Sequence, residues 1–413
     1  MKERILYIIP DYSYATLHLL NYFIKEQSFE VHIAAAYDIK ILNNPFAKKV
    51  NYLKRRLAEW NKVEYNAEIK IISNNIFNLL WITFKIYLEV KKVALSSAMR
   101  NNLQHRVIKK INFSEYKAIY NFDGCSLLFQ KAAKEKGLVT IMESRGNHID
   151  FVLDMNKKIN RTFNSKLPEE KEMGEKWILK LREEVNYSDF IITYSEFQRE
   201  QFLKRLTTRD TLVFKIPISS RFGFRIKPKL YNNSFQFVFI GNQSTAKGLD
   251  LLKEIWYKRI NEIPDNISLS IIGNISLENA DFEKMKRINY LGYFPPEDLK
   301  KYFSDNDLVL IHPSFYESYG MIIAEALSYC IPVITNQYCG AAELIINNRY
   351  GLVYDNPFNT GKLEEMIISI VQYPSIARAF SENIANSFDP SIVENQRNEE
   401  MGKLIQSIKT KLK

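Results

Sequence analysis

The sequence predicts an α/β protein with two doubly wound domains that face each other across a cleft. Short, almost entirely apolar runs such as ERILYII and DLVLIHP have the composition of strands covered on both faces. These runs alternate with segments of helical period, and the alternation stops and then restarts near the middle of the chain. A chain of 413 residues also exceeds one ordinary core, so two domains are expected.

The first domain is predicted over residues 1–217, which begin with the strand ERILYII and end with TLVFKIP. Further strands are expected in FEVHIAAAYD, AEIKIIS, YKAIYNFD, LVTIMESRG and DFIITYSE. A helix is expected from Ser126, a good N-cap, to Gly137, a typical helix stop. Residues 44–110 interrupt the alternation as a long, basic and mostly helical elaboration.

Residues 218–234 are predicted to link the domains, because they contain glycine, proline, an Asn pair and four basic residues. The second domain is predicted over residues 235–388, with strands in FQFVFIG, ISLSIIGN, NYLGYF, DLVLIHPS and IPVITN. Residues 389–413 are predicted to form a terminal helix that can cross back to the first domain. In open α/β sheets ligands bind outside the carboxyl ends of the strands, so a cleft between two such domains suits a two-substrate reaction.

The net charge of +10 is unevenly distributed. Residues 40–110 contain fifteen Lys and Arg but only four Glu and no Asp. Such a stretch can face nucleic acid, an anionic membrane or an anionic substrate, or it can be a solvated helix face. No nucleic-acid-binding module accompanies it, so nucleic acid is not an expected partner.

The cysteines and the apolar segments predict a cytoplasmic protein. Cys125, Cys330 and Cys339 are far apart, with neither metal-ligand spacing nor the pattern of a disulfide framework. The N-terminal apolar run is too short for a signal peptide and is closed by a proline. The stretch Ile76–Val90 contains two charges and cannot span a bilayer, which needs about 20 largely apolar residues. Peripheral attachment to the inner membrane face stays open.

Two carboxylates, Glu317 and Glu325, are separated by seven residues and follow the strand DLVLIHPS. The helix expected to begin near Gly320 has unpaired amide groups at its positive end, which favours a phosphate there. Each carboxylate can accept hydrogen bonds from hydroxyl groups. The spacing therefore suits hydroxyl-rich groups on either side of a diphosphate; the alternative is a surface carboxylate and a helix-face carboxylate without a ligand.

Lys247, in the segment GNQSTAKG, follows a predicted strand and precedes a predicted helix. A cation at this position can neutralise the charge that develops on a departing diphosphate. The alternative is an ordinary solvated lysine. The sequence predicts no metal site and no phosphate-binding P-loop.

The Glu317–Glu325 segment resembles the E-x7-E motif of retaining glycosyltransferases of the GT-B fold, family GT4 (glycosyl transferases group 1). The resemblance extends, in the family's order, over FVFIGNQSTAKGLDLL, LSIIGN, INYLGYFPPEDLKKYFSDNDLVLIHPS and AAELIINNRYGLVYD. It implies transfer of a sugar from a nucleotide-diphosphate donor, a UDP-sugar in the first instance, to a hydroxyl acceptor without a cofactor. It also implies that Glu317 contacts the donor sugar, that Glu325 contacts the ribose, and that the diphosphate meets three amides. These amides belong to Tyr319, Gly320 and Met321.

The resemblance implies further roles around this site. Asn242 stands where the family usually has an arginine, and Arg221 of the linker can take the place of that cation. In ESRGNHID, His148 would position the donor sugar or the acceptor, with an ordinary loop hydrogen bond as the alternative. Arg145 would meet a phosphate or an acidic acceptor. The predicted catalytic residues are Glu317, Lys247 and His148.

The basic elaboration lies in the half that binds acceptors in this fold. It predicts a lipid-linked or polysaccharide acceptor at an anionic membrane surface, as in the synthesis of surface polysaccharide, lipopolysaccharide or glycolipid. Two other functions remain open. One is a non-catalytic partner subunit that keeps the fold, which the residue at Asn242 favours. The other is a GT-B-fold epimerase that acts on a UDP-sugar alone.

Overall fold

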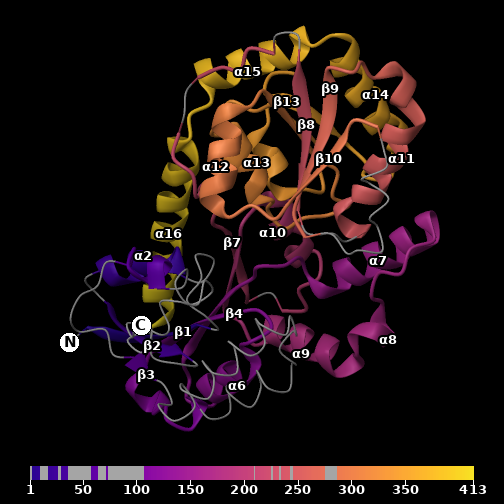
Figure 1. The fold of residues 1–413 in the computed structure, drawn as a ribbon. Helices are drawn as coiled ribbons and strands as arrows, with labels where there is room; N and C mark the ends of the chain where they lie inside the picture. The colour runs from indigo at the N-terminus through magenta and orange to yellow at the C-terminus, as the bar shows by residue number, and fades with distance from the viewer. Residues whose placement is uncertain are drawn as a thin grey trace, which may run out of the picture.

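The chain forms two parallel β-sheets with helices on both faces, as the computed structural model shows (Figure 1). The structure describes residues 2–9, 17–26, 29–35, 57–63, 71–72, 107–208, 210–224, 227–231, 234–241, 245–274 and 286–413. Most of the basic elaboration predicted at 44–110, and Asn242, lie outside these ranges. The predicted fold class, two doubly wound α/β domains, is confirmed.

The first sheet has seven strands in the order β3-β2-β1-β4-β5-β6-β7, all paired in parallel. The strands are β1 (Glu3–Ile9), β2 (Phe29–Ala35), β3 (Ile71–Ile72), β4 (Ala118–Phe122), β5 (Val139–Glu143), β6 (Phe190–Thr193) and β7 (Leu212–Lys215). The helical segments are α2 (Leu20–Lys25), η3 (Phe113–Glu115), α6 (Leu127–Glu135), α7 (Ile149–Phe163), α8 (Glu170–Met173), α9 (Glu175–Asn186) and α10 (Glu196–Leu203).

The second sheet has six parallel strands in the order β10-β9-β8-β11-β12-β13. The strands are β8 (Phe235–Ile240), β9 (Ile267–Ile272), β10 (Ile288–Gly292), β11 (Leu308–His312), β12 (Val333–Asn336) and β13 (Gly351–Tyr354). The helical segments are η4 (Thr245–Lys247), α11 (Leu249–Arg259), η5 (Ile260–Glu262), α12 (Pro296–Asp305), α13 (Met321–Leu327), η7 (Gly340–Leu344), α14 (Thr360–Gln372), α15 (Ser375–Ser387) and α16 (Ser391–Lys411).

The central strands of the second sheet are buried on both faces, which explains their apolar sequences, whereas the edge strand β10 is largely exposed. Successive residues of a strand point to opposite faces. Phe237 of β8 packs in one core with Trp256 of α11, whereas the next residue, Val238, packs in another core with Phe303 of α12. Figure 1 accordingly shows α11 and α14 on one side of the sheet and α12 and α13 on the other.

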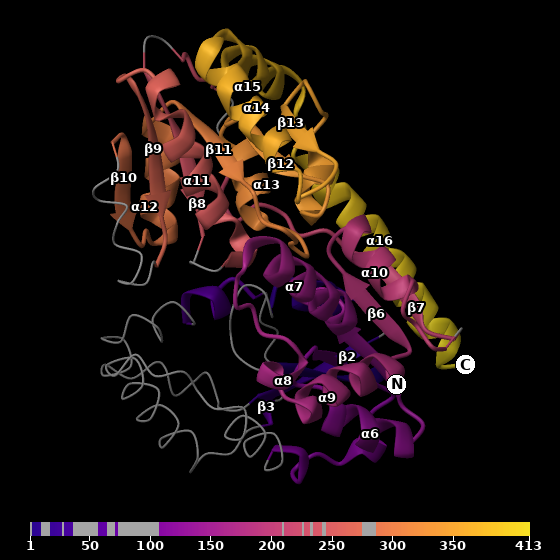
Figure 2. The ribbon, with the colours of Figure 1, turned by 90° about the vertical axis from the view of Figure 1, so that its right-hand side faces the viewer.

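The terminal helix α16 returns to the first sheet. In Figures 1 and 2 it runs, in yellow, from the second sheet down along the first. Its buried residues Met401, Leu404 and Ile408 belong to the same core as β1 and α2. Lys409 also pairs with Glu26 at 3.1 Å, so packing and charge both hold the helix there. None of the helices in the described ranges is long and apolar enough to cross a membrane.

The carboxyl ends of the two sheets meet at one point. Ser318, in the loop after β11, hydrogen-bonds to the loop after β5 at Arg145 and to the loop after β6 at Ser195. Loops from both domains are thus in contact where the predicted site residues lie.

Candidate functional site

Lys247 and Glu317 form an ion pair between two loops of the second sheet. Lys247 is the last residue of η4, which follows β8, and Glu317 lies in the loop between β11 and α13. The backbone amide of Phe315 donates to the carbonyl of Ala246 at 2.8 Å and joins the loops beside the pair. The structure thus brings together two residues that the sequence places 70 positions apart.

Gly248 allows this approach. It has φ +72°, and a Cβ atom there would lie 2.3 Å from the carbonyl oxygen of Pro313. Only glycine accommodates both the left-handed conformation and this close backbone contact. The turn that carries Lys247 therefore packs directly on the end of β11.

The histidine near the Lys247–Glu317 pair is neutral at neutral pH. Burial lowers the pKa of Lys247 from its ordinary value, and Cys339 opposes that effect. His312, at the end of β11, is buried, and burial together with the charge of Lys247 lowers its pKa to about 3. A neutral His312 leaves the ammonium group of Lys247 as the cation that an incoming anion would meet at this point.

Glu325 is fully buried in α13 and pairs with Arg221. The Arg221 Nε atom lies 2.6 Å from Oε1 of Glu325. Burial raises the pKa of Glu325, and Arg221 opposes this rise. The other oxygen, Oε2, is buried and has no hydrogen-bond partner among the described residues. An orphaned buried acceptor is costly, so this atom lacks a hydrogen-bond donor that a bound group could supply.

The loop between the two carboxylates is held in place by η7 and the residues before it. The amide of Glu317 donates to the carbonyl of Tyr338 at 2.9 Å, and the amide of Gly340 donates to the carbonyl of Glu317 at 3.1 Å. Gly320, at φ +89°, is the N-cap of α13, beside the buried Tyr319. The predicted amides at Tyr319–Met321 therefore lie at the start of this helix.

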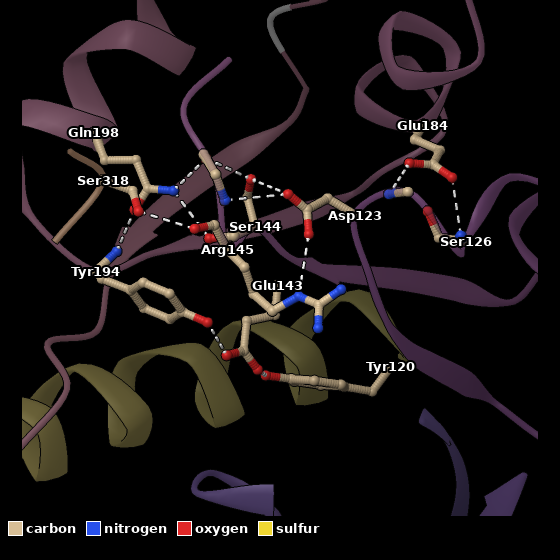
Figure 3. Close-up of polar contacts among 12 residues, drawn as sticks. Tyr120, Asp123, Ser126, Glu143, Ser144, Arg145, Glu184, Tyr194, Gln198 and Ser318 are labelled. Atoms are coloured by element: carbon tan, nitrogen blue, oxygen red, sulfur yellow. Dashed lines mark hydrogen bonds and ion pairs between the residues drawn. The ribbon is translucent and has the colours of Figure 1, made fainter. Parts of the chain in front are cut away.

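Arg145 lies at the junction of the two domains (Figure 3). Its carbonyl accepts a hydrogen bond from the Ser318 hydroxyl at 2.8 Å, while its Nε atom lies 3.5 Å from Asp123. The side chain is about one-third exposed. Its backbone thus contacts the loop between β11 and α13, while its charge is turned toward the first domain.

His148 acts as the N-cap of α7. Its Nδ1 atom accepts a hydrogen bond from the amide of Asp150 at 3.2 Å, and its ring packs against Phe202. Burial lowers its pKa to about 4. No hydrogen bond or ion pair of the described residues joins it to Lys247 or Glu317. These are the contacts of a structural histidine, and its role toward a substrate stays a prediction.

Glu143 is a buried residue of the junction that the sequence analysis did not single out. It ends β5, is fully buried, and accepts hydrogen bonds from the hydroxyls of Tyr120 and Tyr194 (Figure 3). Burial raises its pKa to about 7. The sequence did contain a signal for this residue, because Glu143 is a carboxylate at the end of the apolar run LVTIME. The carboxyl ends of such strands form the edge of the sheet where ligands bind.

Comparison with known proteins places the site in a family context. Residues 221–387 match the family described as "Glycosyl transferases group 1". The lipopolysaccharide glucosyltransferase WaaG of Escherichia coli (strain K12) is 23% identical over 297 residues, which cover 70% of this chain and 75% of WaaG. An uncharacterized 41.2 kDa protein in the cps region of Klebsiella pneumoniae is 30% identical over 127 residues, 30% of this chain and 34% of that protein. The chain thus spans about a third of the length of one relative and three quarters of the other.

A solved structure covers almost the entire chain. The crystal structure of Anabaena HepE in complex with UDP-glucose superposes with a TM-score of 0.58 and 15% identity, over 97% of this chain and 99% of HepE. At this level of identity the likeness concerns the fold.

Proposed function

We propose that this chain, a GT-B-fold member of the glycosyl transferases group 1 family, transfers a sugar from a UDP-sugar to a hydroxyl acceptor with retention of configuration. The observation that carries the proposal is the Lys247–Glu317 ion pair, which lies in the loops next to the buried Glu325. A cation, a helix start and a carboxylate with an unsatisfied oxygen are the groups that a nucleotide diphosphate needs.

The donor would lie along α13. The Oε2 atom of Glu325, which has no partner among the described residues, would accept a hydrogen bond from a ribose hydroxyl. Glu317 would accept a hydrogen bond from a hydroxyl of the donor sugar. Lys247 and the amides at Tyr319–Met321 would meet the diphosphate between them. HepE, with the same fold, has been solved with UDP-glucose, which supports a UDP-sugar as the donor.

Arg221 would have two roles in this arrangement. It balances the buried charge of Glu325, and it is the linker cation that would replace the arginine expected at Asn242. Its guanidinium group has five N–H donors, so one group can bind a carboxylate and a phosphate together.

The reaction would depend mainly on positioning and electrostatics. As the sugar leaves, negative charge grows on the UDP diphosphate, and the ammonium group of Lys247 stabilises it. The departing diphosphate would itself accept the proton of the acceptor hydroxyl on the same face of the sugar. Glu317 would hold the sugar for this attack, because small displacements of reacting groups cost much of the rate.

The acceptor would be a growing surface glycan or a lipid-linked saccharide. Support comes from WaaG, named for lipopolysaccharide, and from the Klebsiella relative in a cps region. His148 and Arg145 would lie on the acceptor side, in the first domain. The protein would work in the cytoplasm, at the inner membrane face where such acceptors are exposed.

A nucleotide-sugar panel tests this proposal. UDP-glucose, UDP-galactose, UDP-N-acetylglucosamine and GDP-mannose are compared for the rise in melting temperature, since a ligand of the folded state stabilises it. Release of free nucleotide is then measured with and without an acceptor. Lys247→Met is expected to lower kcat about 100-fold to 1,000-fold, the effect of losing one transition-state contact. The exposed Lys300→Met, which removes the same charge from α12, is the control.

The outcomes separate the alternatives. Binding without turnover of any donor would indicate a non-catalytic partner. An epimerised sugar formed from the donor alone would indicate an epimerase. If no nucleotide sugar raises the melting temperature, the assigned donor site is wrong.

A further inference from the structure

Ser318 is held by the first domain through two hydrogen bonds. It lies between Glu317 and Tyr319 in the donor-side loop. Its hydroxyl donates to the carbonyl of Arg145 at 2.8 Å (Figure 3). Its own carbonyl accepts from the hydroxyl of Ser195 at 2.6 Å. Both serines are buried. Ser318 is thus fixed at its side chain and at its backbone.

The groups that hold Ser318 are themselves fixed. Gln198 of α10 donates to the carbonyls of Ser144 and Gly146 at 2.9 Å and 2.6 Å, which ties the loop after β5 to α10. Ser195 caps α10 by accepting from the amide of Gln198 at 3.1 Å. The preceding residue, Tyr194, is anchored through its hydroxyl to the buried Glu143. The loops after β5 and β6 therefore form one rigid support.

Gly340 closes the junction from the second domain. A Cβ atom on this residue would lie 2.2 Å from the Ser318 carbonyl oxygen and 2.3 Å from the Ser195 hydroxyl oxygen. These distances leave no room for a side chain. Ser318 is therefore enclosed by Arg145, Ser195 and Gly340, and it cannot shift without moving one of them.

We propose that Ser195 and Ser318 are positioning residues through which the first domain sets the donor-side loop for sugar transfer. The proposal rests on the proposed function. Glu317 directly precedes Ser318 and pairs with Lys247, so a shift of Ser318 displaces the pair from the sugar. In the proposed arrangement the ribose of the nucleotide would contact Glu325 within α13, whereas the donor sugar would contact Glu317, directly before Ser318. Loss of the junction therefore lowers the rate of transfer more than it weakens nucleotide binding.

Ser195→Ala tests this directly. It removes two buried neutral hydrogen bonds, the one donated to the Ser318 carbonyl and the one accepted from the Gln198 amide. Only the first bond reaches the loop of the second domain, and kcat for transfer is expected to fall about tenfold, the equivalent of one such bond. The Kd for UDP is expected to stay within about twofold, because the variant touches no donor group. Hydrogen exchange of the peptide 315–321, measured without ligand, is expected to speed up, because the loop loses its backbone anchor.

Two further variants serve as a matched control and as a second test of the junction. Ser126→Ala is the matched control, because Ser126 is also fully buried in the first domain but its hydroxyl has no hydrogen-bond partner among the described residues. It is expected to leave kcat, Kd and exchange unchanged. Ser318→Ala removes only the bond to Arg145 and is expected to repeat the kcat effect if Ser195→Ala folds poorly.

The readouts distinguish two failures. Unchanged exchange and unchanged kcat in Ser195→Ala overturn the positioning role. A Kd for UDP that weakens as much as kcat falls also overturns it, because the junction would then serve donor binding. Faster exchange in a protein whose wild type turns over no nucleotide sugar keeps the anchor but refutes the proposed function.

Discussion

Replacement of Glu143 by glutamine should remove a pH-dependent part of the protein's stability. The carboxyl group is fully buried at the end of β5, under the hydroxyls of Tyr120 and Tyr194. Burial raises its pKa to about 7, although both tyrosines and Arg145 lower it. Between about pH 5 and pH 7 the folded protein therefore keeps a proton on Glu143 that the unfolded chain has largely lost.

The magnitude follows from the two ionisation points. The group ionises near pH 4.5 in the unfolded chain and near pH 7 in the folded protein. Its stabilising contribution is complete below the lower value and is lost as the pH rises through the upper one. The full change is about 3 kcal/mol, of which about 2.5 kcal/mol falls between pH 5 and pH 8.

The assay compares wild type and Glu143→Gln by urea unfolding at several pH values from 5 to 8. Glutamine is neutral throughout, so the difference in free energy of unfolding between the two proteins should change by about 2.5 kcal/mol across this range. His148 and His312 have pKa values lowered to about 4 and 3, so their contributions to the free energy of unfolding decrease as the pH falls. Both proteins contain them, so their effects cancel in the difference.

Glu297→Gln, which removes an exposed carboxylate from the first turn of α12, is the control. Its difference from wild type should stay constant over this pH range. If the Glu143→Gln difference also stays constant to within about 0.5 kcal/mol, Glu143 is ionised at the same pH in both states and the reasoning is refuted.

Two further predictions concern the donor site and the membrane. Arg221→Met leaves Glu325 buried without its cation, so the melting temperature of the protein should fall. The Kd for UDP, measured by calorimetry, should rise about tenfold, because an interaction with a charged group is lost. An unchanged Kd would exclude Arg221 from the proposed donor site. If the basic residues at 40–110 face an anionic membrane, the protein should co-sediment with anionic but not neutral vesicles at low salt and be released as the salt rises. Failure to bind anionic vesicles at low salt would remove membrane attachment from the proposal.

Local patterns in the sequence were sufficient for the fold class and for the positions of the loops that carry Lys247 and Glu317. Runs such as FQFVFI are almost entirely apolar because both faces of β8 are covered, and this signal needs no knowledge of distant residues. The helix expected near Gly320 begins at Met321, because glycine in the left-handed conformation sets its start. Lys247 and Glu317 each follow a central strand, and adjacent parallel strands bring such loops to one edge of the sheet.

Only the tertiary structure decided which side chains meet across the chain. Arg221 pairs with Glu325 over 104 positions, and Ser195 reaches Ser318 over 123. Glu143 acquires its raised pKa from burial, which only the packing of the folded chain produces. Such contacts depend on how two sheets dock, and docking is determined by shape and burial over many residues, which no local period records. The sequence by itself therefore determined which loops follow the central strands of the second sheet, whereas the docking of the two domains decided what holds those loops in place.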